Sequence, residues 1–156
     1  MKMGACWSNN GSALMQQDRL EKALEQHRSA LKIQEEKAPN SLEIAASCDN
    51  VGLVLMQQGK FAEALEQCRR ALAIQEEKAP NSLEIAAFYD NIGLVLHDQG
   101  RLEEALEKYR RVLEIREKTA PNPLEIVAFY DNIGLVLHDQ GRLEEALEQY
   151  RRAWEI

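Results

Sequence analysis

The sequence has little of what marks several large classes of protein. Its 19 Lys and Arg are outnumbered by 26 Asp and Glu, giving a net charge of −7, which argues against the clustered basic surface needed to bind nucleic acid or an anionic membrane. No apolar run approaches the roughly 18 residues of a membrane-spanning helix, and the N-terminal region carries no signal-peptide core. Three cysteines without framework spacing exclude a disulfide scaffold and favour a reducing compartment. We therefore expect a cytoplasmic protein.

The chain also lacks the motifs of enzymes and metalloproteins. No Ser/His/Asp or Cys/His constellation and no phosphate-cradling glycine loop stands out, so we expect no catalytic activity and no cofactor. His97 and His138 stand beside Asp98 and Asp139, which suggests a metal site or a pH-sensitive surface. Two ligands on neighbouring helices do not complete a coordination shell, so we favour exposed histidines and expect no metal.

The few glycines that are present reveal an internal repeat. Gly11, Gly52, Gly93 and Gly134 are separated by 41 residues each time, and the stretch Ala87–Glu107 recurs without change as Ala128–Glu148. The register divides residues 1–156 into one array with repeats at about 1–41, 42–82, 83–123 and 124–156, the last of them truncated.

Each repeat has the pattern of two amphipathic helices, here named A and B. In the third repeat, an apolar stripe at helical spacing predicts an A helix from about Leu83 to Gln99, and a second stripe predicts a B helix from about Arg101 to Lys118. The stripe of the A helix consists of Ile85, Tyr89, Ile92 and Leu96. We expect Cys48 and Cys68, which stand at aromatic positions of the register, to pack as small apolar residues.

Capping residues set the ends of these helices. Asn81 with Glu84 predicts a capping box, and Asn122 followed by Pro123 predicts a second start. A left-handed glycine is expected to end three of the A helices, at Gly59, Gly100 and Gly141. The first repeat has Asp18 at this position, a tolerated but poorer choice, so we still expect eight helices in all.

The residues at these positions resemble a known family. Tyr89, Ile92, Gly93 and Leu96, followed by Ala105, Tyr109 and Val112, resemble the tetratricopeptide repeat signature, and Trp7 supplies the signature tryptophan in the first repeat. The repeat is longer than the usual one of about 34 residues. This long form resembles the repeats of kinesin light chain, including the Asn-Ile-Gly and Asp-Gln-Gly segments. The resemblance implies an all-α, right-handed superhelix (an α-solenoid) with A helices lining a concave groove, and a non-enzymatic scaffold for protein–protein interaction.

The resemblance also implies which residues face a bound partner. An Asn on each A helix would hold the main chain of a peptide, namely Asn9, Asn50, Asn91 and Asn132. The alternative is that these amides only satisfy a neighbouring helix. The same face carries acids, leucines and histidines: Asp49, Asp90, Asp131, Leu53, Leu94, Leu135, His97 and His138. Because this groove lacks Lys and Arg, we expect a basic or neutral partner, unless the acids only keep an empty groove soluble.

The last B helix suggests a second kind of surface. Four residues with core character have no following A helix to cover them: Leu147, Tyr150, Ala153 and Trp154. Such a patch usually meets a partner, so we expect a homodimer or an end-to-end stack against the first A helix. The rival explanation is a fragment of a longer array. The alternative function is a self-associating structural module, natural or engineered, with no dedicated groove ligand.

Overall fold

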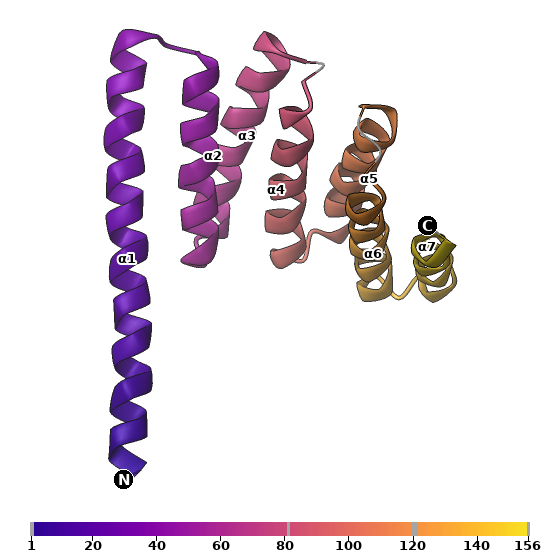
Figure 1. Ribbon diagram of the computed structural model, residues 1–156, viewed down its shortest axis with the longest axis horizontal. Coiled ribbons are helices and arrows are strands. Elements are labelled where there is room, and N and C mark those ends of the chain that lie inside the picture. The colour runs from indigo at the N-terminus through magenta and orange to yellow at the C-terminus, as the bar shows by residue number, and fades with distance from the viewer. Residues whose placement is uncertain (1, 81, 120–121, 156) are drawn as a thin grey trace.

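The computed structural model describes the backbone of residues 2–80, 82–119 and 122–155, and the side chains of residues 16–80, 82–119 and 122–155. Every regular element in these ranges is an α-helix. The helices follow one another side by side in a single row, from α1 at one end to α7 at the other (Figure 1). Their bounds are α1 Lys2–Lys37, α2 Leu42–Gln57, α3 Phe61–Lys78, α4 Glu84–Asp98, α5 Leu102–Thr119, α6 Pro123–Asp139 and α7 Leu143–Glu155.

Three helical hairpins form the regular part of the array, α2 with α3, α4 with α5 and α6 with α7. The expected bounds of the third repeat are confirmed to within one residue at each end of α4 and α5. The turn of each hairpin contains a glycine with positive φ, at Gly59, Gly100 and Gly141, as the sequence predicts. Asn122 caps α6 by accepting a hydrogen bond from the backbone N–H of Leu124 at 3.1 Å. The capping box expected at Asn81 lies outside the described residues.

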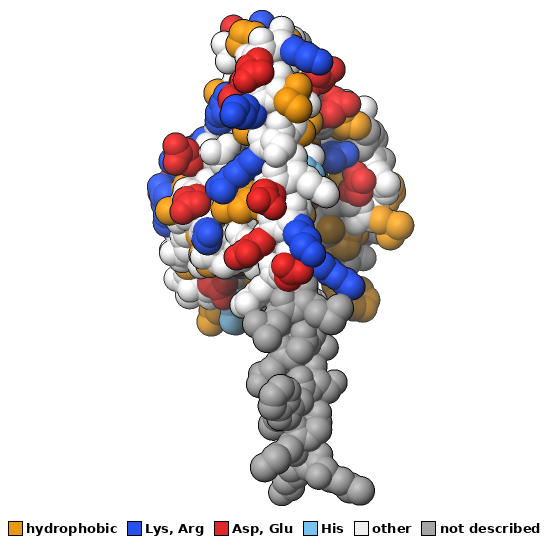
Figure 2. All heavy atoms as spheres, turned by 90° about the vertical axis from the view of Figure 1, so that its left-hand side faces the viewer, with side chains coloured by type: hydrophobic (Ala, Val, Ile, Leu, Met, Phe, Trp, Pro, Cys, Tyr) orange, Lys and Arg blue, Asp and Glu red, His pale blue; other side chains and the backbone are white. Residues whose placement is uncertain are grey.

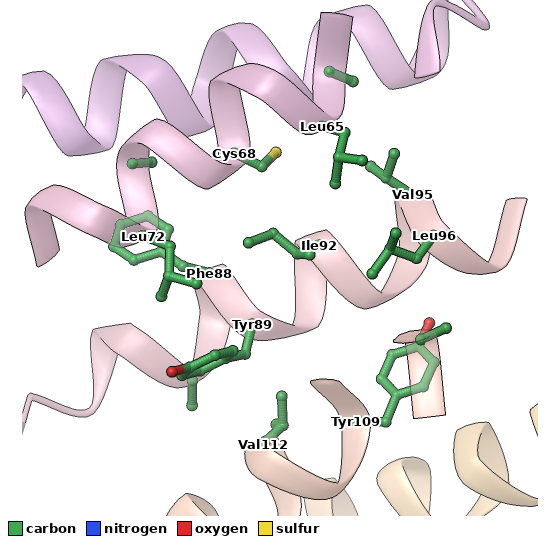
Figure 3. Close-up of a cluster of buried hydrophobic side chains, with 14 of the residues drawn as sticks. Leu65, Cys68, Leu72, Phe88, Tyr89, Ile92, Val95, Leu96, Tyr109 and Val112 are labelled. Atoms are coloured by element: carbon green, nitrogen blue, oxygen red, sulfur yellow. The ribbon is translucent and has the colours of Figure 1, made fainter. Parts of the chain in front are cut away.

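The core is a continuous layer of side chains between successive helices. All four residues of the α4 stripe are buried: Ile85, Tyr89, Ile92 and Leu96. Leu65 and Leu72 of α3 meet one side of α4, while Tyr109 and Val112 of α5 meet another (Figure 3). Each repeat therefore buries its apolar surface against its neighbours, as expected of an array.

In each hairpin, a glycine in the middle of the A helix allows close contact with the B helix. A Cβ atom built on Gly93 would lie 2.8 Å from Cε1 of Tyr109, and one on Gly134 would lie 2.7 Å from Cε1 of Tyr150. The absence of a side chain lets the aromatic ring lie directly on the facing helix. This contact positions the B helix against its own A helix.

Hydrogen bonds between repeats involve the tyrosine of the A helix. The Tyr89 hydroxyl donates to Glu76 Oε1 at 2.5 Å, and the Tyr130 hydroxyl donates to the register-equivalent Glu117 at 3.0 Å. The second repeat has Cys48 in place of this tyrosine. Its equivalent acid, Glu35, instead accepts a hydrogen bond from Arg70 at 2.5 Å.

Both described cysteines are free and buried, which confirms their packing as small apolar residues. Burial raises the pKa of the Cys68 thiol to about 12 and also raises the pKa of Cys48. The two thiols are therefore protonated at neutral pH and unreactive.

The expectation of eight helices is wrong, because the described residues form seven helices. The expected first A helix and first B helix are joined in α1, which continues through Asp18. The reason lies at the turn position, where the other hairpins use glycine with φ between 76° and 79°. An aspartate is disfavoured in this left-handed conformation and accepts the helical one.

Candidate functional site

The residues expected to line the groove lie on α2, α4 and α6 and form what we name the A-helix face: Asp49, Asn50, Leu53, Asp90, Asn91, Leu94, His97, Asp131, Asn132, Leu135 and His138. Asn9 belongs to the same register, but its side chain lies outside the described set. The face is partly covered rather than fully open. All four of its members on α4 are half-buried, whereas Asn50, Asp131 and His138 are exposed.

An amide–carboxylate pair links α2 to α4. The Asn91 Nδ2 group donates to both carboxylate oxygens of Asp49 at 3.0 Å. Burial raises the pKa of the Asp49 carboxyl, and the hydrogen bond from Asn91 works in the opposite direction. Because the Asn91 Nδ2 group already donates to Asp49, the side-chain carbonyl oxygen of Asn91 is the atom still able to form a hydrogen bond with a ligand.

A histidine–carboxylate pair links α4 to α6. His97 Nε2 lies 2.7 Å from Asp139 Oδ2, and this hydrogen bond lowers the pKa of the Asp139 carboxyl. His138 approaches the same carboxylate from its own helix, with Nδ1 3.7 Å from Oδ1. Among the side chains that the structure describes, no group of three potential metal ligands comes together. The two histidines that the sequence singles out therefore share a carboxylate.

Asp90 differs from its register equivalents. Its Oδ1 atom is buried without a hydrogen-bond partner. Burial raises the pKa of the Asp90 carboxyl, and the positive charge of Arg116 opposes this effect. Arg116 belongs to α5 and pairs with Glu125 at 3.1 Å. This oxygen is closed to solvent, so a donor from outside the chain cannot reach it unless the side chains around it rearrange.

Leucines lie along the same face. Leu53 and Leu94 are half-buried, and Leu135 on α6 is exposed. They offer apolar contact beside the acids and amides, so the face has both of the chemical features that a bound segment requires.

Sequence reasoning did not identify a concave region between α4 and α5. A cavity of about 230 Å³ is lined by residues that include Ile85, Tyr89 and Arg111. Lys108 Nζ also lies 5.6 Å from the centre of the Tyr89 ring. The apolar stripe of the A helix predicts that Tyr89 is a core residue. Nothing in the sequence indicates that Tyr89 also lines a cavity.

The charge of the surface is mixed, and none of the described helices is long and apolar enough to cross a membrane. Acidic and basic side chains alternate over the face that α1 presents, without an extended patch of one sign (Figure 2). Two ion pairs involve α1, Arg70 with Glu35 and Lys22 with Asp18. Exposed pairs of this type contribute about 0–1 kcal/mol each.

The last helix exposes apolar side chains. Trp154 is 91% exposed and Leu147 is 51% exposed, whereas Leu106, the equivalent of Leu147 on α5, is 1% exposed because α6 follows it. Tyr150 is half-buried against Gly134, and Ala153 is buried. Of the four residues expected to mediate self-association, two are therefore available at the surface.

Comparison with known proteins agrees with the repeat architecture. The family model of the tetratricopeptide repeat matches residues 3–77 and 43–118, and a second model with the same description matches residues 127–156. A search of curated proteins finds no match.

Solved structures show the same fold. BtubC (BKLC) from P. vanneervenii is similar with a TM-score of 0.82 and 25% identity, over 88% of this chain and 56% of that one. The chain thus spans little more than half the length of this relative. A putative kinesin light chain from Podosopora anserina, described by its nearly identical TPR-like repeats, matches with a TM-score of 0.80 and 19% identity, over 93% of this chain and 70% of that one. On its family matches and its repeat geometry, the chain belongs to the tetratricopeptide repeat family, with repeats like those of kinesin light chain.

Proposed function

We propose that the chain is a non-enzymatic scaffold whose A-helix face binds an extended or helical segment of another protein. Family membership supports protein–protein interaction in general. The observation that carries the specific proposal is the row of acids, amides and leucines on α2, α4 and α6, of which Asn50, Asp131 and Leu135 are exposed. Exposed acceptors beside exposed apolar side chains suit a segment that supplies both hydrogen-bond donors and apolar contact.

The chemistry of this face favours a basic or neutral partner. Asp90 and Asp131 are acceptors on successive A helices, and Leu94 and Leu135 lie one turn further along the same helices. A Lys or Arg side chain, or main-chain N–H groups, would satisfy the carboxylates, while apolar side chains would cover the leucines. An acidic segment would bring like charges together and bind poorly.

The asparagines would bind the main chain of such a segment. Among the described side chains, no hydrogen bond occupies the amides of Asn50 and Asn132, so each can donate and accept. Asn91 would act mainly through its carbonyl oxygen, because Asp49 engages its amide nitrogen. Asn9 would add a fourth amide if the first A helix joins the array.

A set of three labelled peptides tests this proposal. Each has about 12 residues with the same leucine spacing, and the remaining positions are lysine, glutamine or glutamate. We expect fluorescence anisotropy to show tightest binding of the lysine peptide and weakest binding of the glutamate peptide. Asp131→Asn should raise the dissociation constant of the lysine peptide by roughly three- to tenfold, which corresponds to about 0.7–1.4 kcal/mol of binding free energy.

The matched control is Glu144→Gln, which removes the same charge from α7, outside the A-helix face. It should leave peptide binding unchanged. Equal losses in Asp131→Asn and Glu144→Gln would show that net charge alone attracts the peptide, and tightest binding of the glutamate peptide would overturn the proposal.

A second candidate function is self-association through α7, favoured by the exposed side chains of Trp154, Leu147 and Leu143. A second copy or a further repeat would cover them in the way that α6 covers α5. Light scattering of Trp154→Glu tests this candidate, because a dimer that survives the substitution does not use the surface. The single array over residues 1–156 and the cytoplasmic location remain proposals as well.

A further inference from the structure

Helix α1 is straight at the point where the other repeats turn. The turn glycine of those repeats corresponds to Asp18, which is helical. The Lys22 ammonium pairs with the Asp18 carboxylate at 3.1 Å, one helical turn away. This is the i, i+4 contact of a continuous helix. The first half of α1 consequently projects beyond the ends of the neighbouring helices (Figure 1).

A straight α1 leaves one face of its second half uncovered. Ile33 is 52% exposed, whereas its equivalent on α3, Ile74, is 6% exposed. The same difference holds for Ala30, which is exposed, and Ala71, which is fully buried. In the regular hairpins, the A helix of the same repeat packs on the B helix. No described element takes that place on α1.

The vacant place is visible as a concavity. A cavity of about 510 Å³ opens between α1 and α2, lined by Leu20, Ala23 and Gln57 together with Gln16 and Arg19. On α3, the equivalent of Ala23 is Ala64, which is fully buried in the hairpin with α2. The lining is therefore that of a helix–helix interface from which one helix is missing.

The register of the chain identifies the helix that fits. In each regular hairpin, the glycine of the A helix lies against the B helix, as Gly52 does against Cys68. Gly11 has the same register, and His27 stands at the position of Cys68. Residues 2–17 are thus an A helix by sequence. As the straight continuation of their own B helix, they cannot fold back onto it.

We propose that residues 2–17 of one copy pack on the second half of α1 in another copy, so that two chains exchange their first A helices. Each copy supplies one A helix that continues straight out of its own B helix and one vacant face, which closes the assembly at two chains. Gly11 of one chain would face His27 of the other, and the reverse contact would be identical. The midpoint between positions 11 and 27 is residue 19, so the two-fold axis passes beside Asp18.

The exchange restores contacts that the fold already uses. A monomer with a folded-back first helix and the exchanged dimer have the same helix–helix interface and differ at the turn. The monomer requires the left-handed conformation at position 18, which an aspartate disfavours, while the dimer keeps position 18 helical. Exchange about a hinge of this type creates no helix–helix interface that the monomer lacks. The proposed exchange is independent of the proposed function of the A-helix face.

A cysteine pair reports which arrangement exists in solution. The Cβ atom built on Gly52 lies 2.5 Å from Cys68 Sγ, so cysteines at the equivalent positions 11 and 27 would be within bonding reach. We would introduce Gly11→Cys and His27→Cys together with Cys6→Ser and oxidise the protein at micromolar concentration. A covalent dimer on a non-reducing gel supports the exchange. A disulfide confined to single chains overturns it.

Variants at the hinge provide a second measurement, made by size exclusion with light scattering on chains that retain their native cysteines. Asp18→Gly supplies the missing turn residue and should raise the dissociation constant of the dimer by at least about tenfold. Asp18→Ala removes the same carboxylate but favours a helix, so this control should remain dimeric. A wild-type chain that is monomeric throughout, or a dimer that Asp18→Gly leaves unchanged, contradicts the proposal. Loss of the dimer in Trp154→Glu would assign association to α7 instead.

Discussion

Gly93 shows how a single missing side chain positions two helices. Its Cα faces the Tyr109 ring, which is 1% exposed and has no room to move. Gly93→Val should therefore lower the free energy of unfolding by about 1–3 kcal/mol through overpacking. Ala87→Val adds similar bulk to the exposed side of the same helix and should cost about 0.5 kcal/mol from helix propensity alone. Urea denaturation of the two variants measures the difference, and equal effects would contradict the close contact.

Asp90 makes stability depend on pH in a direction opposite to that of most carboxylates. Burial raises the pKa of its carboxyl above the ordinary 3.8, so the folded chain binds this proton more tightly than the unfolded chain. Its contribution to stability is therefore greatest at low pH and declines as the pH rises through the folded pKa. Asp90→Asn should increase the free energy of unfolding at pH 7 by about 0.5–1 kcal/mol.

The gain in Asp90→Asn should disappear near pH 3, where the wild-type carboxyl is protonated in both states. Thermal unfolding of the variant and the wild type across this pH range gives the comparison. Asp131→Asn is the matched control, because Asp131 has the same register but is exposed. A gain that persists at low pH would mean that charge is not its cause.

The sequence predicts which residues share a face better than it predicts their partners. The stretches around Asn91 and Asn132 are identical, yet their contacts differ. Asn91 donates to Asp49 of the preceding A helix. One repeat later, the equivalent pair would be Asn132 with Asp90, but Oδ1 of Asp90 has no hydrogen-bond partner. Likewise, His97 reaches Asp139 on the next helix while His138 faces only its own helix neighbour. Side-chain rotamers and the small offsets between repeats decide these contacts, and neither can be read from a repeat register.

At the scale of the helix, the turn glycines separate one element from the next. Gly100 has a φ of 76°, and nothing lies within 4 Å of a Cβ atom built there. Gly100→Ala therefore tests backbone conformation without a steric clash, and it should destabilise the fold by about 1–2 kcal/mol. Asp98→Ala, two residues earlier in a helical conformation, should be nearly neutral. Calorimetry of both variants measures this, and a neutral Gly100→Ala would argue against the left-handed turn in solution.

The same turn explains where the prediction of elements succeeded and where it failed. Periodicity located α4 and α5 to within a residue, because a strong apolar stripe and a turn glycine agree there. At Asp18 the two signals disagree: the repeat register requires a turn, while aspartate lacks the freedom of glycine to adopt the left-handed conformation of that turn. The register alone predicted eight helices, but local backbone preference gave the continuous α1.

At the scale of the whole molecule, the row of helices has contacts mainly between neighbours in sequence. The stability of such an array is approximately the sum of its repeats and the interfaces between them. The central hairpin of α4 and α5 has a neighbour on each side, while α6 and α7 have a neighbour on one side only (Figure 1). The C-terminal hairpin should therefore open before the centre does.

Two isoleucines at the same register test this behaviour. Ile92 of α4 and Ile133 of α6 are both fully buried, so truncation to alanine removes the same side chain from a central and a terminal repeat. Each should cost about 2–5 kcal/mol locally. Ile92→Ala should lower the main unfolding transition and weaken hydrogen-exchange protection in every helix from α2 to α7, because it divides the array. Ile133→Ala should deprotect α6 and α7 and leave α2 to α5 close to wild type. If both variants lose protection uniformly, the chain unfolds as one cooperative unit, and the coupling between repeats exceeds the stability of any single one.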